Sequence, residues 1–196
     1  MSKLENAKVE IVEDRTLSDD WYHLRKVTFD YTNSRGEVHR LSRECYDRGH
    51  GATILLFDPA RQVVILVRQF RMPAYLTGHP GWLVETPAGL LDGDAPAEAI
   101  RREAVEETGY EVRDIRFLFE CFISPGAITE RIHFFYARVD IDHKVNDGGG
   151  LDEEHEDIEV LEIPLDDALS MIGTGEICDG KTIMLLQWAA LNRDTL

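Results

Sequence analysis

The sequence predicts a mixed α/β domain with a small antiparallel β-sheet at its N-terminal end. Three observations support this fold class: short runs rich in β-branched and aromatic residues, one long helical segment that interrupts them, and two apolar helical segments that close the chain. Strands around one helix, closed by C-terminal helices, are typical of a mixed sheet covered by helices. The 196 residues suit an N-terminal extension, which we expect over 1–48, and a main domain over 49–196.

The N-terminal extension shows the signals of a β-hairpin. Val27, Phe29 and Tyr31 alternate with polar residues, as the side chains of a half-buried strand do. The turn sequence Asn-Ser-Arg-Gly over 33–36 then precedes a return strand. Taken in order, the expected strands of the whole chain cover 8–13, 21–31, 38–46, 52–57, 63–68, 83–85, 112–123, 132–139 and 158–163.

The main domain opens with two continuous apolar runs, over 52–57 and 63–68, joined by an Asp-Pro-Ala turn. Runs without alternation suit central strands that are buried on both faces. Helices are expected over 95–108, 165–172 and 182–191, and a glycine-rich acidic loop over 147–157.

The ends of the 95–108 helix carry recognisable signals. Pro96 suits a first turn, and Gly109 suits the C-terminal stop. Asp94 is a candidate N-cap, and a metal-binding role is an equal alternative for this residue.

Three carboxylates, Glu103, Glu106 and Glu107, occupy one face of this helix. Like charges three or four residues apart destabilise an isolated helix by about 0.2–0.5 kcal/mol per pair. A bound divalent cation would offset that repulsion, and Mg²⁺ favours carboxylates together with substrate phosphates. Glu106 is expected either to bind the cation or to pair with Arg102, which has a possible role in orienting the glutamates.

Composition limits the classes of function. The net charge is −16, from 37 acidic and 21 basic side chains, which argues against nucleic acids and anionic membrane surfaces as partners. A bound cation would still permit small phosphorylated ligands. The three cysteines show neither zinc spacing nor a disulfide framework, and no apolar signal segment or membrane span is visible. We therefore expect a cytoplasmic protein.

Basic residues are scarce, so Arg71 and Lys181 stand out. Arg71 follows a buried apolar strand, where a guanidinium can hold a diphosphate in a bidentate manner; the alternative is a surface salt bridge. Lys181 stands at the start of the last helix, where anions are favoured; the alternative is simple exposure to solvent.

Two loops supply further candidates. The acidic loop contains five carboxylates over 152–157, and a carboxylate beside a bound cation is a plausible water-activating base; the alternative is a solvated acidic surface. Glu130 ends a Ser-Pro-Gly turn and could accept hydrogen bonds from a sugar or a base. The histidines show no ligand spacing.

The segment over 89–110 resembles the Nudix box, G-x5-E-x7-R-E-U-x-E-E-x-G-U, in which U is apolar. The second half matches closely. In the first half an aspartate, Asp94, replaces the glutamate, and the loop is one residue shorter. Similarity extends over nearly the whole chain, in segments such as VVILVRQFR, ISPGAITERIHFFYA and TGEICDGKT, to the GDP-mannose branch of the Nudix hydrolases, which is related to the ADP-ribose pyrophosphatases. The shortened loop is itself a feature of that branch.

This resemblance implies an αβα sandwich and a hydrolase that depends on Mg²⁺, with Mn²⁺ as a possible substitute, and that splits GDP-mannose into GMP and mannose 1-phosphate. It also implies a homodimer with exchanged N-terminal sheets. The residues implied to bind metal are Ala88, Glu103, Glu107 and Glu156, and those implied in catalysis are Glu103, Glu107, Glu156 and Arg102. The implied substrate-binding residues are Tyr22, Arg43, Glu44, Arg71, Ala88, Gly89, Leu90, Glu130, His155, Glu156 and Lys181.

Within the acidic loop, which is longer than in that branch, His155 replaces an expected acid. The base among Glu153, Glu154 and Glu156 therefore stays open. Hydrolysis of ADP-ribose is the first alternative function, because both substrates carry a diphosphate between two sugars. A non-catalytic nucleotide-sugar sensor is the second, although the intact glutamates argue against it. An RNA-end hydrolase fits poorly with the net charge.

Overall fold

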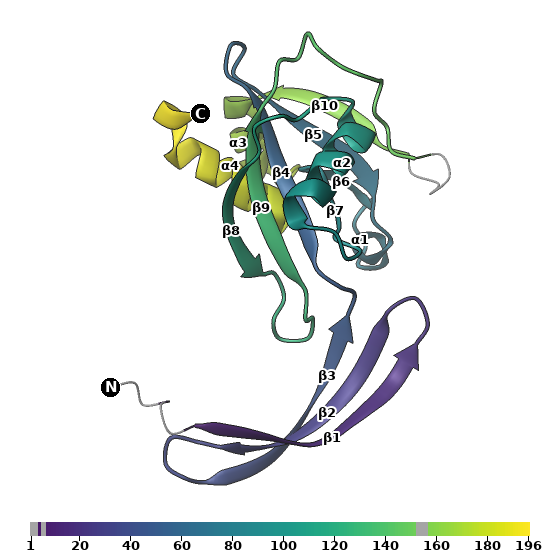
Figure 1. The fold of residues 1–196 in the computed structure, drawn as a ribbon, viewed down its shortest axis with the longest axis vertical. Coiled ribbons are helices and arrows are strands. Elements are labelled where there is room, and N and C mark those ends of the chain that lie inside the picture. The colour runs from purple at the N-terminus through teal and green to yellow at the C-terminus, as the bar shows by residue number, and fades with distance from the viewer. Residues whose placement is uncertain (1–3, 5–6, 152–156) are drawn as a thin grey trace. The chain divides into compact units, whose positions relative to one another are not determined.

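The structure is a computed structural model that describes residue 4, residues 7–151 and residues 157–196. These residues form two compact units (Figure 1). The first unit contains the described chain up to His50 together with Phe122–Arg131, and the second contains Gly51–Cys121 and Ile132–Leu196.

The N-terminal unit is built on an antiparallel sheet of β1 (Lys8–Asp19), β2 (His23–Thr32) and β3 (Val38–Asp47), in that order. The predicted turn is present: the Asn33 side chain accepts hydrogen bonds from the backbone amides of Arg35 and Glu37. β1 extends six residues beyond the predicted end at residue 13, and two register shifts interrupt its pairing with β2. Each shift breaks the alternation of side chains from which a strand is recognised.

The loop that carries Glu130 belongs to this same unit. Tyr46 on β3 donates its backbone amide to the Ala127 carbonyl at 2.8 Å and accepts from the Thr129 amide at 3.1 Å. The turn sequence thus continues the edge of the N-terminal sheet.

The second unit contains a mixed sheet with the strand order β10-β5-β4-β9-β8, which β6 extends beside β5 and β7 beside β4. β4 runs parallel to β9 and antiparallel to β5 and β7. The strand bounds are β4 Gly51–Asp58, β5 Val63–Phe70, β6 Trp82–Glu85, β7 Ala88–Leu90, β8 Arg116–Phe122, β9 Arg131–Arg138 and β10 Glu159–Pro164.

Helices cover both faces of this sheet: α2 lies on one face, and α3 and α4 lie on the other (Figure 1). Alternate residues of β4 therefore enter two different cores. Ile54 packs in the core that contains Ile100 of α2, whereas Leu55 packs in the core that contains Leu185 of α4. The predicted αβα sandwich is confirmed. The helices are α1 Met72–Leu76, α2 Pro96–Thr108, α3 Leu165–Thr174 and α4 Gly180–Leu191, followed by a 3₁₀ turn, Arg193–Thr195.

Two short elements, α1 and β7, were not predicted. α1 spans five residues, none of them buried, and β7 spans three residues. Segments this short carry no periodicity from which a type of element can be recognised. Among the described residues, no helix combines the length and the apolar character needed to span a membrane.

Candidate active site

The strand β7 and the helix α2 bring three of the predicted metal-binding residues, Ala88, Glu103 and Glu107, close together. β7 pairs with β4 through Ala88, Gly89 and Leu90, which places its backbone alongside the first three residues of β4. The Ala88 amide donates a hydrogen bond to Oε2 of Glu107 at 3.2 Å. Glu107 is only 3% exposed. A carboxylate buried to this degree requires such partners, because its desolvation is otherwise costly.

Gly89 leaves room for the second glutamate. A Cβ atom added at Gly89 would lie 2.3 Å from the carboxyl carbon of Glu103, so that carboxylate lies directly against the β7 backbone. Glu103 and Glu107 stand one helical turn apart on the same face of α2 and both reach β7. The two carboxylates and the adjacent backbone form an oxygen-rich site of the kind that Mg²⁺ favours.

The described residues contain no group of three histidine, cysteine or acidic side chains close enough to hold a metal ion by themselves. Mg²⁺ usually takes one or two carboxylates and completes its shell with water and substrate phosphates. The donor set near β7 therefore fits a divalent cation that is shared with a phosphorylated ligand.

One of the two alternatives given for Asp94, and one of the two given for Glu106, is wrong. The N-cap is Ala95, which makes no side-chain cap hydrogen bond, and Asp94 instead accepts from Nη1 of Arg102 at 2.6 Å. The second contact of Arg102 is with Glu103 at 3.4 Å, and not with Glu106. Arg102 thus joins the loop aspartate to a candidate metal ligand. The C-terminal prediction is confirmed, because Gly109 ends the helix with a φ of 77°.

The two predicted phosphate-binding cations, Arg71 and Lys181, meet on one buried carboxylate. Arg71 donates from Nε and Nη2 to the two oxygens of Glu85, at 3.0 and 2.9 Å. Nζ of Lys181 lies 3.5 Å from Oε2 of Glu85 and 2.8 Å from Oδ1 of Asp179. The Glu85 side chain is 3% exposed and that of Lys181 is 18% exposed. Arg71 thus forms a salt bridge, although its partner is a buried carboxylate, and the alternative of a simply solvent-exposed Lys181 is wrong.

The electrostatics of this cluster keep both cations charged. Burial disfavours the charged form of Lys181, but the negative charges of Glu85 and Asp179 outweigh it and raise the pKa of the ammonium group. Burial likewise opposes the charge of Asp179, yet Lys181 and the Thr182 hydrogen bonds lower the pKa of that carboxyl. For Arg71, burial is outweighed by the Glu85 hydrogen bond and by the charges of Glu85 and Glu107, so its pKa is raised.

The glycine-rich loop is attached to the C-terminal end of α2. The amides of Gly149 and Gly150 donate to the carbonyls of Glu107 and Glu106, at 2.9 and 3.1 Å. Gly148, with a φ of 69°, lies so close that an added Cβ would be 2.7 Å from the Glu107 carbonyl oxygen. The predicted residues Glu153, Glu154, His155 and Glu156 lie outside the described part of the chain.

The remaining predicted residues, Tyr22, Arg43, Glu44 and Glu130, belong to the N-terminal unit. Arg48 connects two of them: its guanidinium lies 5.7 Å from the Tyr22 ring centroid, and its Nε lies 3.4 Å from Oε1 of Glu130. Arg43 and Glu44 are consecutive on β3 and pair with Val27 and Lys26. Their side chains therefore point to opposite faces of this sheet.

Sequence reasoning missed Glu85, Asp179 and Arg48. Glu85 offered one signal, since an acidic residue that ends a buried strand requires a cationic partner. Asp179 offered another, as an aspartate before a helix is a candidate N-cap, and its Oδ2 indeed accepts from the Thr182 amide at 2.9 Å. The sequence around Arg48 contains no comparable signal.

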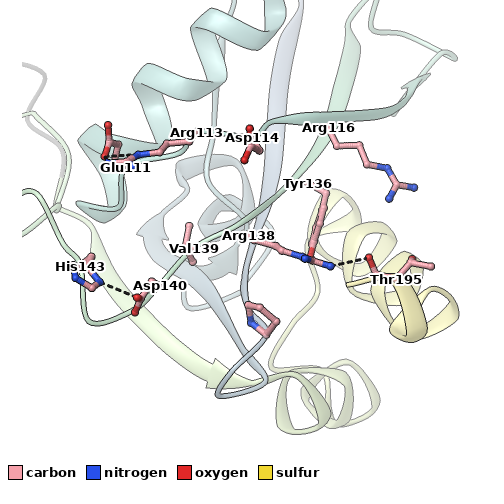
Figure 2. A pocket seen from close by; sticks show the side chains of 11 residues that line it. Glu111, Arg113, Asp114, Arg116, Tyr136, Arg138, Val139, Asp140, His143 and Thr195 are labelled. Carbon is pink, nitrogen blue, oxygen red and sulfur yellow. Dashed lines mark hydrogen bonds and ion pairs between the residues drawn. The ribbon is translucent and has the colours of Figure 1, made fainter.

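A cavity of about 850 Å³ lies elsewhere in the second unit (Figure 2). Arg116, Tyr136 and Arg138 line it, and Arg138 donates to the Thr195 carbonyl at 3.4 Å. None of the described residues predicted for the site lines this cavity. This cavity is therefore not assigned as the active site, despite its volume.

Comparison with known proteins identifies the family of this chain. Residues 8–46 match the family model described as the GDP-mannose pyrophosphatase NudK N-terminal domain, and residues 47–186 match the NUDIX domain. The chain is 53% identical over 182 residues to a GDP-mannose pyrophosphatase of Citrobacter koseri, an alignment that covers 92% of this chain and 94% of the relative.

Two further relatives carry the same name. They come from Enterobacter sp. (strain 638), at 51% identity, and from Escherichia coli O157:H7, at 50% identity, and each alignment covers 94% of this chain and 96% of the relative. Because the domain model covers residues 47–186 and the relatives align along more than nine-tenths of the chain, this protein belongs to the Nudix family.

Proposed function

We propose that this protein hydrolyses the diphosphate bond of GDP-mannose, giving GMP and mannose 1-phosphate. The observation that carries the proposal is the convergence of Glu103 and Glu107 on β7. The negative charge of Glu107 also helps to raise the pKa of Arg71, which is one of the two cations held by Glu85. The name shared by the relatives supports GDP-mannose as the substrate.

Nudix hydrolases use divalent metal cations. We propose Mg²⁺ for this protein, with Mn²⁺ as a substitute, bound by Glu103, Glu107 and the Ala88 carbonyl. When bound, the cation neutralises phosphate charge and lowers the pKa of a coordinated water. The protein's own part is to hold the carboxylates against β7 and to bind the diphosphate through Arg71 and Lys181, which fixes the phosphorus atom for in-line attack.

One water is added across the P–O–P link, so a general base must accept a proton from it. We propose that this base comes from the acidic loop, with Glu156 as the leading candidate and Glu153 and Glu154 as alternatives. Support comes from the attachment of Gly149 and Gly150 to the last carbonyls of α2, since it brings the start of this loop to the helix that carries the glutamates.

For the N-terminal unit we propose a role in nucleotide-sugar binding through Tyr22, Arg43, Glu44 and Glu130, and a role in forming a homodimer. β1 is exposed along its whole length, and it presents the apolar side chains of Val9 and Ile11, which are 65% and 66% exposed. A second copy of the chain would cover this surface. Light scattering coupled to size-exclusion chromatography tests the dimer.

Product analysis tests the proposed reaction. The purified protein is incubated with GDP-mannose and Mg²⁺, and the products are separated by anion-exchange chromatography. GMP and mannose 1-phosphate in equal amounts are expected, together with loss of activity when a chelator removes the metal. Release of GDP and mannose would contradict the proposal, because it would place the cleavage at the glycosidic bond. Absence of product would favour the sensor alternative.

A further inference from the structure

Glu85 holds two cations at the same time. Its two oxygens accept from Arg71 at 3.0 and 2.9 Å, and one of them also lies 3.5 Å from Nζ of Lys181. Arg71 uses only Nε and Nη2 for this contact, and its side chain remains 39% exposed. The Nη1 donors of the guanidinium are therefore not used in the contact with Glu85.

A carboxylate between two cations removes an electrostatic conflict. The positive charge of Arg71 opposes protonation of Lys181, so these two groups would repel each other without an intervening negative charge. Asp179 contributes a second negative charge, with its Oδ1 at 2.8 Å from Nζ of Lys181. The four groups form a balanced set in which the more buried partners are acidic and the more exposed ones are basic.

The backbone around Glu85 is fixed from several directions. The next residue, Thr86, donates its amide to Oγ1 of Thr182 at 2.7 Å, and the Pro87 carbonyl accepts from Oγ1 of Thr53 at 3.0 Å. Ala88 then donates to Glu107. One segment of four residues, from Glu85 to Ala88, thus contacts both cations and the carboxylate of Glu107.

We infer that Glu85 is a positioning residue, which holds Arg71 and Lys181 side by side as a preorganised two-cation site for the diphosphate of a nucleotide sugar. The inference rests on the proposed function, of which it specifies the diphosphate-binding part. A diphosphate presents negative charge on two adjacent phosphoryl groups, and two fixed cations match it better than one. Glu85 itself, at 3% exposure, acts through the cations and not on the substrate.

The test is the variant Glu85→Gln, which keeps the shape of the side chain and removes its charge. Steady-state kinetics on GDP-mannose should show KM raised about tenfold with kcat changed less than about twofold, because the lost interaction contributes equally to the ground and transition states. Calorimetric binding of inorganic diphosphate should weaken by a similar factor. Asp58→Asn is the matched control, since Asp58, the last residue of β4, is also a buried carboxylate, is 3% exposed, and accepts hydrogen bonds from three backbone amides.

Each outcome decides the matter. A lower melting temperature with unchanged KM and unchanged diphosphate affinity would overturn the inference and leave Glu85 a purely structural residue. Tighter diphosphate binding would also overturn it, because it would show that Glu85 competes with the ligand for the cations. If Glu85→Gln does not fold, Glu85→Asp withdraws the carboxylate by one methylene and should still raise KM. The diphosphate measurement stays valid if the wild type fails to cleave GDP-mannose, so failure of the proposed function is recognised separately.

Discussion

The backbone carbonyl of Glu107 accepts a hydrogen bond from the amide of Gly149 at 2.9 Å. This contact joins the last turn of α2, which carries a candidate metal ligand, to the loop in which we place the general base. The side chain of Glu107 is held separately, by the Ala88 amide. Glu107 is thus the residue at which the sheet, the helix and the acidic loop are connected.

Gly148→Ala should damage this connection. The new Cβ would lie 2.6 Å from the Thr108 carbonyl carbon, and the φ of 69° already disfavours a side chain. We expect the free energy of unfolding to fall by about 2–4 kcal/mol and activity to fall with it. Gly149→Ala is the matched control, because its φ is also positive but its nearest contact would be at 3.7 Å. Equal effects of the two substitutions would contradict a role for the close contact.

Glu107→Gln should remove most of the turnover while the protein stays folded. The amide still accepts from Ala88, but it loses the negative charge that a divalent cation requires, and we expect kcat to fall by about 100-fold or more. Rates with saturating Mg²⁺ and circular dichroism melting curves provide the measurement. Glu98→Gln, on the exposed first turn of the same helix, should retain normal rates. Full activity of Glu107→Gln would show that the metal site lies elsewhere.

Gly89→Ala tests the close approach of Glu103 to β7. Displacing that carboxylate by about 1 Å should reduce kcat/KM on the order of 100-fold. Gly173→Ala in α3 is the comparison, since a Cβ there would meet nothing within 4 Å. That control should keep its activity and gain slightly in stability, by roughly 0.5–1 kcal/mol, from better helix propensity. Normal activity of Gly89→Ala would show that the reaction does not depend on the close packing of Glu103 against β7.

The Asp179 carboxyl predicts a particular dependence of stability on pH. Its pKa in the folded state lies below the ordinary value of 3.8, so its stabilising effect is fully present above that pH and is lost as the pH falls through the folded-state pKa. The difference in unfolding free energy between wild type and Asp179→Asn should therefore be constant from about pH 5 to pH 8 and shrink below about pH 4. Urea titrations across this range provide the values. A difference that stays constant down to pH 3 would contradict a charge-based role.

Much of the second unit could be predicted because its signals are local. The helix α2 was expected over 95–108 and observed as Pro96–Thr108, with glycine at its end. The continuous apolar runs became β4 and β5 in the middle of the sheet. Sequence spacing also placed Glu103 and Glu107 on one helical face, since three or four residues complete one turn.

The parts of the site that could not be predicted depend on contacts between distant segments. Glu85 meets one partner 14 residues before it and another 96 residues after it, and no local pattern records such a pairing. Asp94 is of a residue type that often caps helices, yet its carboxylate accepts a hydrogen bond from Arg102 and the N-cap position is occupied by Ala95. The role of Gly89 likewise became visible only once Glu103 was placed against it.

The most direct test of the account compares kcat/KM for GDP-mannose and ADP-ribose on the purified protein with Mg²⁺, with the products identified in each reaction. We expect GDP-mannose to be preferred by at least about tenfold, a difference of roughly 1.4 kcal/mol in transition-state binding, with GMP and mannose 1-phosphate as the products. Preference for ADP-ribose, with AMP and ribose 5-phosphate as the products, would contradict the proposed substrate while leaving the acidic pair and the two cations in their assigned roles.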